Sequence, residues 1–418
     1  MRLRASMNSF AQSNNSVKKS TVLIISANLE VGGIERSLIG LLGVFDYNRF
    51  DVDLMLYRHQ GSFLKLLPKG PRLLPQISEY STFERPIIQI LREGHVRIAL
   101  ARLRAKFSSQ LDGQRHGIQE PGYIALQRGW RYALPCLPMI HGQYDLAISF
   151  IVPHYTVTER VNAKIKIGWI HTDYRVIPND GNYEAAMWER LDYIVAVSNE
   201  CRESFLERFP QFLRKTIVIE NILSSDFIRR QAMEFDCDKE MPPETGLTRI
   251  LTVGRFTHQK AFDEAVLACR KLIEVGCNIR WYAIGYGPDE SMIHELIAAH
   301  GLAGRFIILG VKTNPYPYMR VCDLYVQPSR YEGKAVTVRE AQILGKPVLI
   351  TRFPTASSQV EEGVDGHICE LGVDGVAAGV RRLIDDSAYR NRIAATAASR
   401  DYDNKDEVKK IYSLIPQA

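Results

Sequence analysis

The sequence predicts an α/β protein made of two Rossmann-like parallel-sheet domains that face each other across a cleft. Short runs of β-branched residues alternate with helical stretches along the chain, as in parallel strands joined by crossover helices. A chain of 418 residues is too long for one ordinary core and suggests two domains of roughly 200 residues each. With 46% hydrophobic and 24% charged residues, the composition is that of a soluble globular protein.

The candidate strands fall into two groups, one in each half of the chain. Those of the first half are Val22–Ala27, Val52–Tyr57, Leu146–Phe150, Ile165–Ile170, Ile194–Ser198 and Ile217–Glu220. Those of the second half are Ile250–Val253, Ile279–Ile284, Phe306–Leu309, Leu324–Gln327 and Val348–Thr351. Ligands of such sheets bind beyond the carboxyl ends of the strands, so we expect the functional residues in the loops that follow them.

Residues 236–247 separate the two groups. This stretch is acidic, carries two prolines and has the only linker-like composition in the middle of the chain. We therefore expect a first domain over residues 21–235 and a second over residues 248–390. Residues 1–20 are polar and basic and lack an apolar stretch for secretion, which predicts a disordered leader. Residues 391–418 form a helical segment that could pack back on the first domain.

The cysteines indicate the compartment. Seven are scattered along the sequence, an odd number without a C-x-x-C pair, which disfavours both a disulfide framework and a metal knuckle. We therefore expect a reducing cytoplasm. Nothing in the sequence approaches the ~18 continuous apolar residues of a membrane-spanning helix.

Positive charge is concentrated in residues 85–131. Nine Arg or Lys residues stand there against three Asp or Glu residues, a net charge of +6, which equals that of the whole chain. Isoleucine and leucine interleave with the arginines, a pattern that suits a basic amphipathic segment on an anionic membrane surface. A helical hairpin with its arginines in water is the alternative. Nucleic acid is disfavoured, because the segment has few aromatic side chains for stacking and no recognised motif.

Two glycine pairs follow predicted strands. Gly32 and Gly33 open a helix, where they would let a ligand approach the backbone and the helix N-terminus would favour an anion. A tight turn is the alternative. Gly285 and Gly287 are followed by two acidic residues that would compete with phosphate, so we expect that turn to be mainly structural. Because the dinucleotide fingerprint G-x-G-x-x-G is missing, a nicotinamide cofactor is disfavoured.

Two cations follow the strand Ile250–Val253. Arg255 and Lys260 stand at the carboxyl end of this strand, where a diphosphate would lie. Either one alone could be part of a surface salt bridge, but the two together favour a nucleoside-diphosphate ligand. No aspartate-rich D-x-D motif stands at a strand end, so the sequence predicts neither a metal nor a cofactor.

Two carboxylates stand at and after the start of a later helix. Glu332 precedes Gly333 in a strand-to-helix turn, and Glu340 falls two turns into the helix on an otherwise apolar arc. Eight residues of helix rise about 12 Å, whereas the carboxyls of a glycosidase stand ~5–10 Å apart. Two acceptor groups for an elongated, polyhydroxylated ligand therefore fit better than a hydrolytic pair. A turn cap at Glu332 and a buried salt bridge at Glu340 are the alternative.

His171 follows the strand Ile165–Ile170. A lone histidine is usually a structural group. Here it would project into the cleft from the first domain, beside the loop that carries Gly32 and Gly33.

Together these residues resemble the family 4 glycosyltransferases, retaining enzymes with the two-domain GT-B fold. The resemblance spans about residues 21–390 and is most specific in GRFTHQK (254–260) and SRYEGKAVTVREAQILGKPV (329–348). The family's E-x7-E motif falls on Glu332 and Glu340, and its phosphate-binding cations fall on Arg255 and Lys260. Its glycine loop falls on Gly32 and Gly33, and its cleft histidine on His171.

The resemblance implies a role for each residue. Glu340 would hold the ribose, Gly33 would approach the pyrophosphate, and His171 would contact the transferred sugar near its reacting carbon. The donor sugar would be held by Glu332, Gly333 and the backbone of Lys334, Ala335 and Val336. Family members often carry an aromatic or Gly-Pro-like run where this chain has Lys334-Ala335, so the identity of the sugar stays open.

We therefore expect a cytoplasmic, retaining, metal-independent glycosyltransferase of the hexosyltransferase type. Its donor would be a nucleotide sugar, most simply a UDP-sugar. Its acceptor would be a saccharide, lipid-linked and at the inner face of the membrane, in the synthesis of capsule, exopolysaccharide or O-antigen. A GT-B-like sugar-nucleotide epimerase and a non-catalytic nucleotide-sugar-binding module are the alternatives, and a nicotinamide oxidoreductase is a more distant one.

Overall fold

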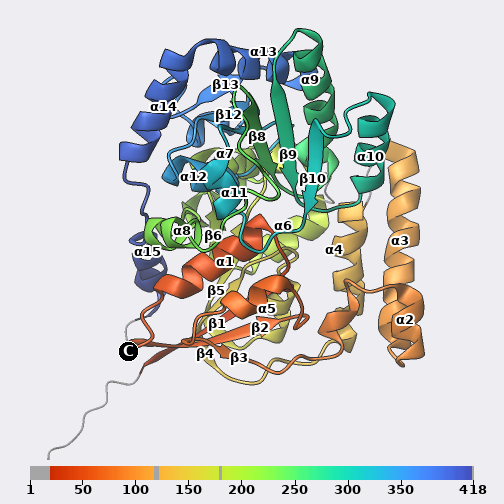
Figure 1. The fold of residues 1–418 in the computed structure, drawn as a ribbon. Helices are drawn as coiled ribbons and strands as arrows, with labels where there is room; N and C mark the ends of the chain where they lie inside the picture. Colours follow the sequence, from red (N-terminus) through yellow and green to blue (C-terminus); the bar gives the residue numbers. More distant parts are fainter. Residues whose placement is uncertain (1–18, 117–121, 178–180, 417–418) are drawn as a thin grey trace, which may run out of the picture.

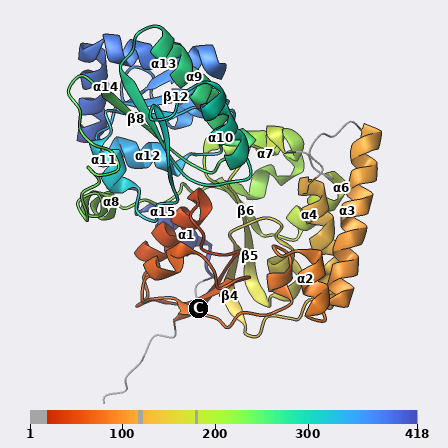
Figure 2. The same ribbon diagram turned by 45° about the vertical axis from the view of Figure 1, so that its right-hand side comes forward.

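The structure, a computed structural model, describes residues 19–116, 122–177 and 181–416. Its two α/β domains, one above the other in Figure 1, are each built around one parallel sheet. Figure 2 shows the domains from a second direction, with helix α1 (Gly33–Val44) where they meet. The predicted fold class is confirmed. No helix within the described ranges has both the length and the apolar character needed to cross a bilayer.

The first sheet has seven strands in the order β3-β2-β1-β4-β5-β6-β7, paired in parallel. The strands are β1 (Ser20–Ser26), β2 (Phe50–Leu56), β3 (Arg72–Leu73), β4 (Tyr144–Ser149), β5 (Ala163–Ile170), β6 (Tyr193–Ala196) and β7 (Thr216–Val218). The helices of this domain, in addition to α1, are α2 (Ile87–Arg92), α3 (Val96–His116), α4 (Gly122–Ala133), α5 (Tyr155–Arg160), α6 (Gly181–Glu189) and α7 (Asn199–Arg208).

The second sheet has six strands in the order β10-β9-β8-β11-β12-β13, also parallel. The strands are β8 (Thr248–Val253), β9 (Ile279–Ile284), β10 (Phe306–Gly310), β11 (Leu324–Gln327), β12 (Val348–Thr351) and β13 (His367–Cys369). The later helices of the chain are α8 (Ser225–Gln231), α9 (Phe262–Glu274), α10 (Glu290–Ala299), α11 (Tyr316–Val321), α12 (Val336–Ile343), α13 (Gly372–Asp385), α14 (Ser387–Ser399) and α15 (Glu407–Leu414).

Both faces of each sheet are buried. In β1, Val22 and Ile24 enter one hydrophobic cluster while Leu23 and Ile25 enter the cluster on the opposite face. A strand that is covered on both sides reads as a continuous apolar run rather than as an alternating one. This explains why the central strands were recognisable in the sequence. The two that were not predicted, β3 and β13, are only two and three residues long.

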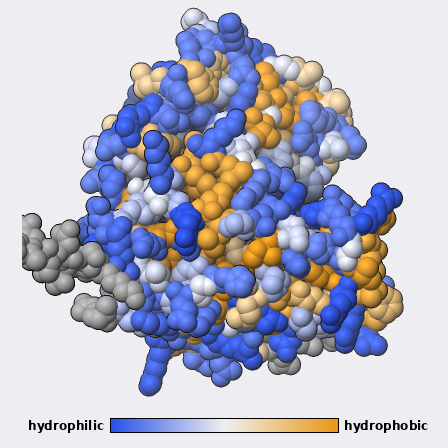
Figure 3. Space-filling view, turned by 90° about the horizontal axis from the view of Figure 1, so that it is seen from below, coloured by the Kyte–Doolittle hydropathy of each residue, from blue (hydrophilic) through white to orange (hydrophobic). Residues whose placement is uncertain are grey.

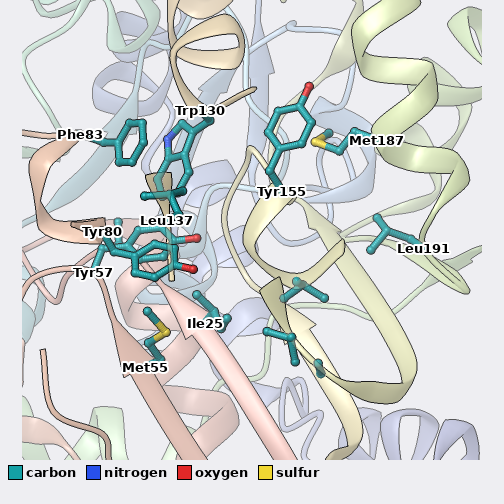
Figure 4. Packing of buried hydrophobic residues seen from close by; sticks show 14 of the residues in the cluster. Ile25, Met55, Tyr57, Tyr80, Phe83, Trp130, Leu137, Tyr155, Met187 and Leu191 are labelled. Atoms are coloured by element: carbon teal, nitrogen blue, oxygen red, sulfur yellow. The ribbon is translucent and has the colours of Figure 1, made fainter. Parts of the chain in front are cut away.

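An aromatic cluster fixes the helical layer beside the first sheet. Trp130 of α4 stacks on Phe83 with a centroid distance of 3.6 Å and an interplanar angle of 7°. Tyr57, which follows β2, stacks on Tyr80 at 5.7 Å. Figure 4 shows these two ring pairs next to each other in the core. Because α3 packs on α4, this cluster also sets the position of α3.

The first domain ends earlier than the predicted bounds of 21–235. Ile222 packs in the core of the first domain, whereas Leu223 and, in the following helix α8, Ile228 pack in the core of the second. The chain therefore crosses between the domains directly after β7. The crossing is only a few residues long and includes the apolar pair Ile222-Leu223, so it has no linker-like composition.

The predicted linker, residues 236–247, is part of the second domain. Cys237 and Met241 are buried in its core, while the acidic residues around them face the solvent. The acidic composition of residues 236–247 therefore comes from their solvent-exposed side chains and does not mark a linker between the domains. Of the predicted leader, residues 1–20, only the last two are among the described residues, and Ser20 begins β1.

The chain returns to the first domain after α14. Ile393 of α14 lies in a core cluster of the second domain, and Ile411 of α15 lies in one of the first. The ring of Tyr412 stacks on Phe50 with a centroid distance of 4.6 Å. In Figure 1 the segment after α14 descends on the left from the upper domain to the lower one.

The two crossings are hydrogen-bonded to each other. The Leu223 amide donates to Asn404 Oδ1 at 3.0 Å, and Asn404 Nδ2 donates to the carbonyl of Asn221 at 2.9 Å. Two segments far apart in the sequence thus form one paired connection between the domains.

In both sheets the strand order changes direction next to the first strand. Strand β1 lies between β2 and β4, and β8 lies between β9 and β11. Open parallel sheets bind ligands at such switch points, beyond the carboxyl ends of the strands. The loops that follow β1, β8 and β11 carry most of the residues that the sequence singled out.

Candidate active site

The loop after β1 presents one open glycine. Gly33 is exposed, and a Cβ atom added to it would meet no atom within 4 Å. At Gly32 an added Cβ would lie 2.2 Å from Glu35 Oε2, so the carboxylate of Glu35 already covers that position. Burial raises the pKa of Glu35 to about 7, and the charge of Arg255 in the second domain opposes this shift. The loop is therefore open to a ligand at Gly33 and lies within electrostatic range of Arg255.

The loop after β8 is held in shape by its neighbour. A Cβ at Gly285 would lie 1.8 Å from the carbonyl oxygen of Gly254, and one at Gly287 would lie 2.3 Å from that of Phe256. These two glycines therefore let the turn after β9 support the cation-bearing loop. The loop ends at Ala261, which has a φ of 53°. A positive φ is uncommon for a residue other than glycine.

Glu332 and Lys260 form a buried ion pair. Lys260 Nζ lies 2.5 Å from Glu332 Oε1, and Glu332 is 4% exposed. Ser329 Oγ donates to the same carboxylate oxygen at 2.6 Å, and Gln259 Nε2 donates to the other at 3.3 Å. Three donors from two loops therefore hold this carboxylate in a fixed position, which is what an acceptor for sugar hydroxyls needs.

Glu340 is fully enclosed and meets polar groups from both domains. Tyr316 OH donates to Glu340 Oε1 at 2.7 Å, and Arg36 Nε of the first domain lies 3.4 Å from the same oxygen. Burial raises the pKa of Glu340, while the charge of Arg36 and the hydrogen bond from Tyr316 counteract the shift. The buried salt bridge foreseen as the alternative for Glu340 is present, and it spans the domain boundary. Its role towards the ribose stays a prediction.

The side chain of Arg36 is packed between aromatic rings. Its guanidinium carbon lies 4.4 Å from the ring centroid of Phe63 and 5.0 Å from that of Tyr316. Its Nη2 also donates to the carbonyl of Thr313 at 3.4 Å. Because Arg36 belongs to α1 and the other groups except Phe63 to the second domain, this side chain fastens one domain to the other.

His171 meets the second domain through its backbone. A Cβ at Gly333 would lie 2.2 Å from the carbonyl oxygen of His171, so only glycine allows this approach. His171 Nε2 lies 2.9 Å from the carbonyl oxygen of Phe150. Burial lowers the pKa of the ring to about 4, although this hydrogen bond counteracts the shift. The neutral ring therefore donates through Nε2, which leaves Nδ1 as an acceptor.

The turn from Lys334 to Val336 is tied to other parts of the chain. Lys334 Nζ lies 2.6 Å from Glu220 Oε1, next to the crossing between the domains. The amide of Ala335 donates to Gln359 Oε1 at 2.9 Å. The Ala335 amide thus already has an acceptor within the protein. The backbone groups of Lys334 and Val336 therefore fit the predicted contacts with a sugar better than that of Ala335.

The structure brings most of the predicted residues together through a series of contacts. Glu332 meets Lys260, Gly333 meets His171, and Glu340 meets the helix opened by Gly32 and Gly33. Arg255 differs, since it is exposed and its guanidinium carbon lies 5.9 Å from the ring centroid of Tyr286. The cation that contacts Glu340 is Arg36, which was not among the residues singled out from the sequence.

Sequence reasoning missed the side chains that hold the two carboxylates. Arg36 was visible three residues after the glycine pair, but nothing in one sequence indicates that it crosses to the other domain. Tyr316, Gln259 and Ser329 gave no signal, because each acts only through tertiary contacts. Within the described ranges, no group of three or more His, Cys, Asp or Glu side chains is arranged to hold a metal ion.

Comparison with solved structures identifies the class of fold. The structure of Anabaena HepE in complex with UDP-glucose aligns with a TM-score of 0.67 at 16% identity and covers 94% of this chain and 100% of that one. With two parallel-sheet domains meeting at their switch points, this chain has the GT-B fold.

Sequence comparison then finds similarity over the second half of the chain. Residues 237–400 match the family described as Glycosyl transferases group 1. The lipopolysaccharide core biosynthesis mannosyltransferase LpsB of Rhizobium meliloti (strain 1021) is 34% identical over 157 residues, which are 35% of this chain and 43% of that protein. The alpha-D-kanosaminyltransferase of Streptomyces kanamyceticus is 29% identical over 152 residues, 36% and 39% of the two chains. The chain thus spans about two fifths of the length of these curated relatives. Residues 237–400, which make up most of the second domain, are thus similar to the glycosyl transferases group 1 family.

Proposed function

We propose that the protein is a retaining, metal-independent glycosyltransferase that moves a sugar from a UDP-sugar to a saccharide acceptor. The observation that carries the proposal is the pair of carboxylates at positions 332 and 340, both buried at the domain boundary and both held by fixed donors. Buried carboxylates are costly unless they are satisfied. Two of them at one domain boundary would offer a polyhydroxylated ligand two fixed acceptors.

The donor is assigned to the second domain. Glu332 receives hydroxyls of the sugar, and Glu340 receives those of the ribose. Lys260, which Glu332 neutralises in this structure, turns its remaining donors to the diphosphate, and Arg255 approaches the same group from the loop surface. The exposed amide of Gly33 faces the diphosphate from the first domain.

The transfer needs no covalent protein intermediate. The acceptor hydroxyl attacks the anomeric carbon on the face from which the diphosphate leaves, and the bond from that carbon to the phosphate oxygen breaks. The leaving oxygen keeps the electron pair and takes the proton of the acceptor hydroxyl. Arg255 and Lys260 stabilise the negative charge that develops on the diphosphate, an electrostatic effect aimed at the leaving group. His171 Nδ1 accepts a hydrogen bond from the transferred sugar and so orients it.

The proposed acceptor is a lipid-linked saccharide of the cell envelope. LpsB, which resembles part of this chain, is named for lipopolysaccharide core biosynthesis. The proposed location is cytoplasmic, at the inner face of the membrane. The basic segment over residues 85–131 supports an acceptor that is reached at an anionic surface.

Glu340→Gln tests the proposal. Binding and turnover of UDP-sugars are measured by calorimetry and by separating the products, with UDP-sugar alone and with a set of saccharide acceptors. We expect transfer by the wild type and a loss of about tenfold or more in the variant. Conversion of the donor to an isomer without any acceptor would assign an epimerase instead. Donor binding without turnover across the acceptors would assign a binding module.

A further inference from the structure

Helix α3 carries an apolar stripe on its outer side. Val96, Leu100, Leu103, Phe107 and Leu111 follow one another at intervals of three or four residues, so they share one face of the helix. All five are exposed, Leu100 by 59% and Phe107 by 66%. Fifteen residues of helix extend about 22 Å. Figure 3 shows apolar surface along the right-hand edge of the molecule, the side on which α3 lies in Figure 1.

The stripe is not needed for the core. The opposite face of α3 is the buried one, with Ile98 and Ala99 in the aromatic cluster of the first domain. A Cβ on Gly129 of α4 would lie 3.9 Å from the Cβ of Ala105, which shows how closely the inner faces of α3 and α4 pack. A helix with one apolar face inside and a second apolar face outside presents the second to something other than its own domain.

Basic side chains border the stripe. Arg97, Arg104 and Lys106 are exposed on α3 and have no ion-pair partner among the described residues. The two acidic residues of segment 85–131 that the structure describes are paired with other arginines, Glu93 with Arg85 and Asp112 with Arg128 at 2.6 Å. The outer face of α3 is therefore both apolar and positive.

The preceding helix extends the same surface. Ile88 of α2 is 67% exposed, and Arg92 at the end of α2 is exposed as well. Between α2, α3 and α4 lies a hollow of about 350 Å³, whose apolar walls include Phe83, Ile87 and Leu126 and whose lining includes Lys106. The residues of α3 that line this hollow are other than those of the stripe, and they include the two cations Arg102 and Lys106.

We propose that the outer face of α2 and α3 docks on an anionic lipid bilayer, with the apolar stripe in the headgroup layer and the basic side chains on the lipid phosphates. The combination of a continuous apolar row with unpaired cations selects this partner, since a bilayer offers both an apolar interior and a negative surface. The proposal deepens the proposed function and rests on it, because a lipid-linked acceptor is met at a membrane.

Sedimentation with phospholipid vesicles tests the docking directly. Full-length protein is mixed with vesicles of phosphatidylcholine alone or with added phosphatidylglycerol, at low and high salt and without any donor. We expect binding that needs phosphatidylglycerol and weakens with salt. The double variants Leu100→Ser/Phe107→Ser and Arg97→Glu/Arg104→Glu should each bind at least about tenfold more weakly.

Val275→Ser/Leu371→Ser is the matched control. Both residues are 50% exposed on the second domain, so this variant loses a similar apolar area elsewhere and should bind like the wild type. Equal binding of all variants, or no binding by the wild type, would overturn the proposal. A wild type that is dimeric in light scattering and becomes monomeric with Leu100→Ser/Phe107→Ser would assign the stripe to a second copy of the chain instead.

The outcome is separable from that of the proposed function. Glu340→Gln should still bind the vesicles, because this carboxylate is buried at the domain boundary and far in the sequence from the stripe. Conversely, transfer to a water-soluble acceptor should be unchanged in Leu100→Ser/Phe107→Ser. Loss of transfer with vesicle binding intact would count against the donor site alone.

Discussion

Arg36 Nε of the first domain lies 3.4 Å from Glu340 Oε1 of the second, and both side chains are buried. The carboxylate that the resemblance assigns to ribose is thus matched by a cation from the opposite side of the domain boundary. A nucleotide bound as proposed would therefore meet the same carboxylate that Arg36 of the first domain contacts. This link between the two halves of the site motivates the first prediction.

Arg36→Met should destabilise the protein more than Arg36→Met combined with Glu340→Gln. Removing one partner of a buried pair leaves the other charge uncompensated, at a cost of about 3–5 kcal/mol. Replacing both removes that charge. Chemical unfolding of the four proteins of the double-mutant cycle measures the coupling, for which we expect about 0.5–3 kcal/mol. Purely additive effects would show that the pair does not form in solution.

Gly333→Ala should impair transfer while leaving each domain folded. An added Cβ would lie 2.2 Å from the carbonyl oxygen of His171, so the loop and His171 must move apart. We expect a loss of at least about tenfold in kcat/KM for the donor.

The control for this substitution is Gly43→Ala. An added Cβ at Gly43 in α1 meets no atom within 4 Å, and alanine is a better helix former than glycine. This variant should keep full activity and unfold at the same or a slightly higher temperature. Normal kinetics in Gly333→Ala would contradict the close contact between the domains.

Lys260→Ala should weaken donor binding even though Lys260 already has a partner. The ammonium group is shared between Glu332 and the proposed diphosphate, and its loss also leaves Glu332 buried with two neutral donors. We expect about a 10²-fold loss in kcat/KM. Lys271→Ala is a suitable control, because Lys271 pairs with Asp374 on the surface of the same domain. Calorimetry with UDP separates binding from turnover, and unchanged UDP affinity in Lys260→Ala would remove this residue from the donor site.

His171 should contribute to acid sensitivity rather than to the pH dependence of transfer near neutrality. Its pKa is lowered to about 4 in the folded protein, against about 6.5 in an unfolded chain. Between these values the unfolded state binds the proton and the folded state does not, so stability falls as pH drops from about 6.5 towards 4.

His171→Asn should therefore show a smaller loss of melting temperature between pH 7 and pH 5 than the wild type. Differential scanning calorimetry at several pH values measures this difference. The buried His154, whose burial lowers its pKa to about 3, is unchanged in the variant and keeps part of the acid sensitivity. An equal loss in both proteins would show that the His171 ring is not the neutral, half-buried group described above.

The sheets were predictable because their central strands are long apolar runs between polar turns. The site was predictable as far as it depends on local sequence, since Glu332, Lys260 and Gly33 each follow a recognisable strand. Contacts between the domains were not predictable. The partner of Glu340 and the glycine requirement at position 333 depend on how two separate sheets meet, which no local pattern encodes. The prediction of a linker at residues 236–247 was wrong, because linkers and exposed loops share an acidic, proline-rich composition.

Both described ends of the chain belong to the first domain, with β1 at one end and α15 at the other. Residues 223–402 are therefore, in topological terms, an insertion into the first domain, and the entry and exit points of the insertion are bonded to each other through Asn404. Tension applied between the two termini would load the host domain and bypass the inserted one. Replacing the inserted domain by that of a relative thus requires two junctions that lie next to each other in space. The first domain would keep its own C-terminal helix α15.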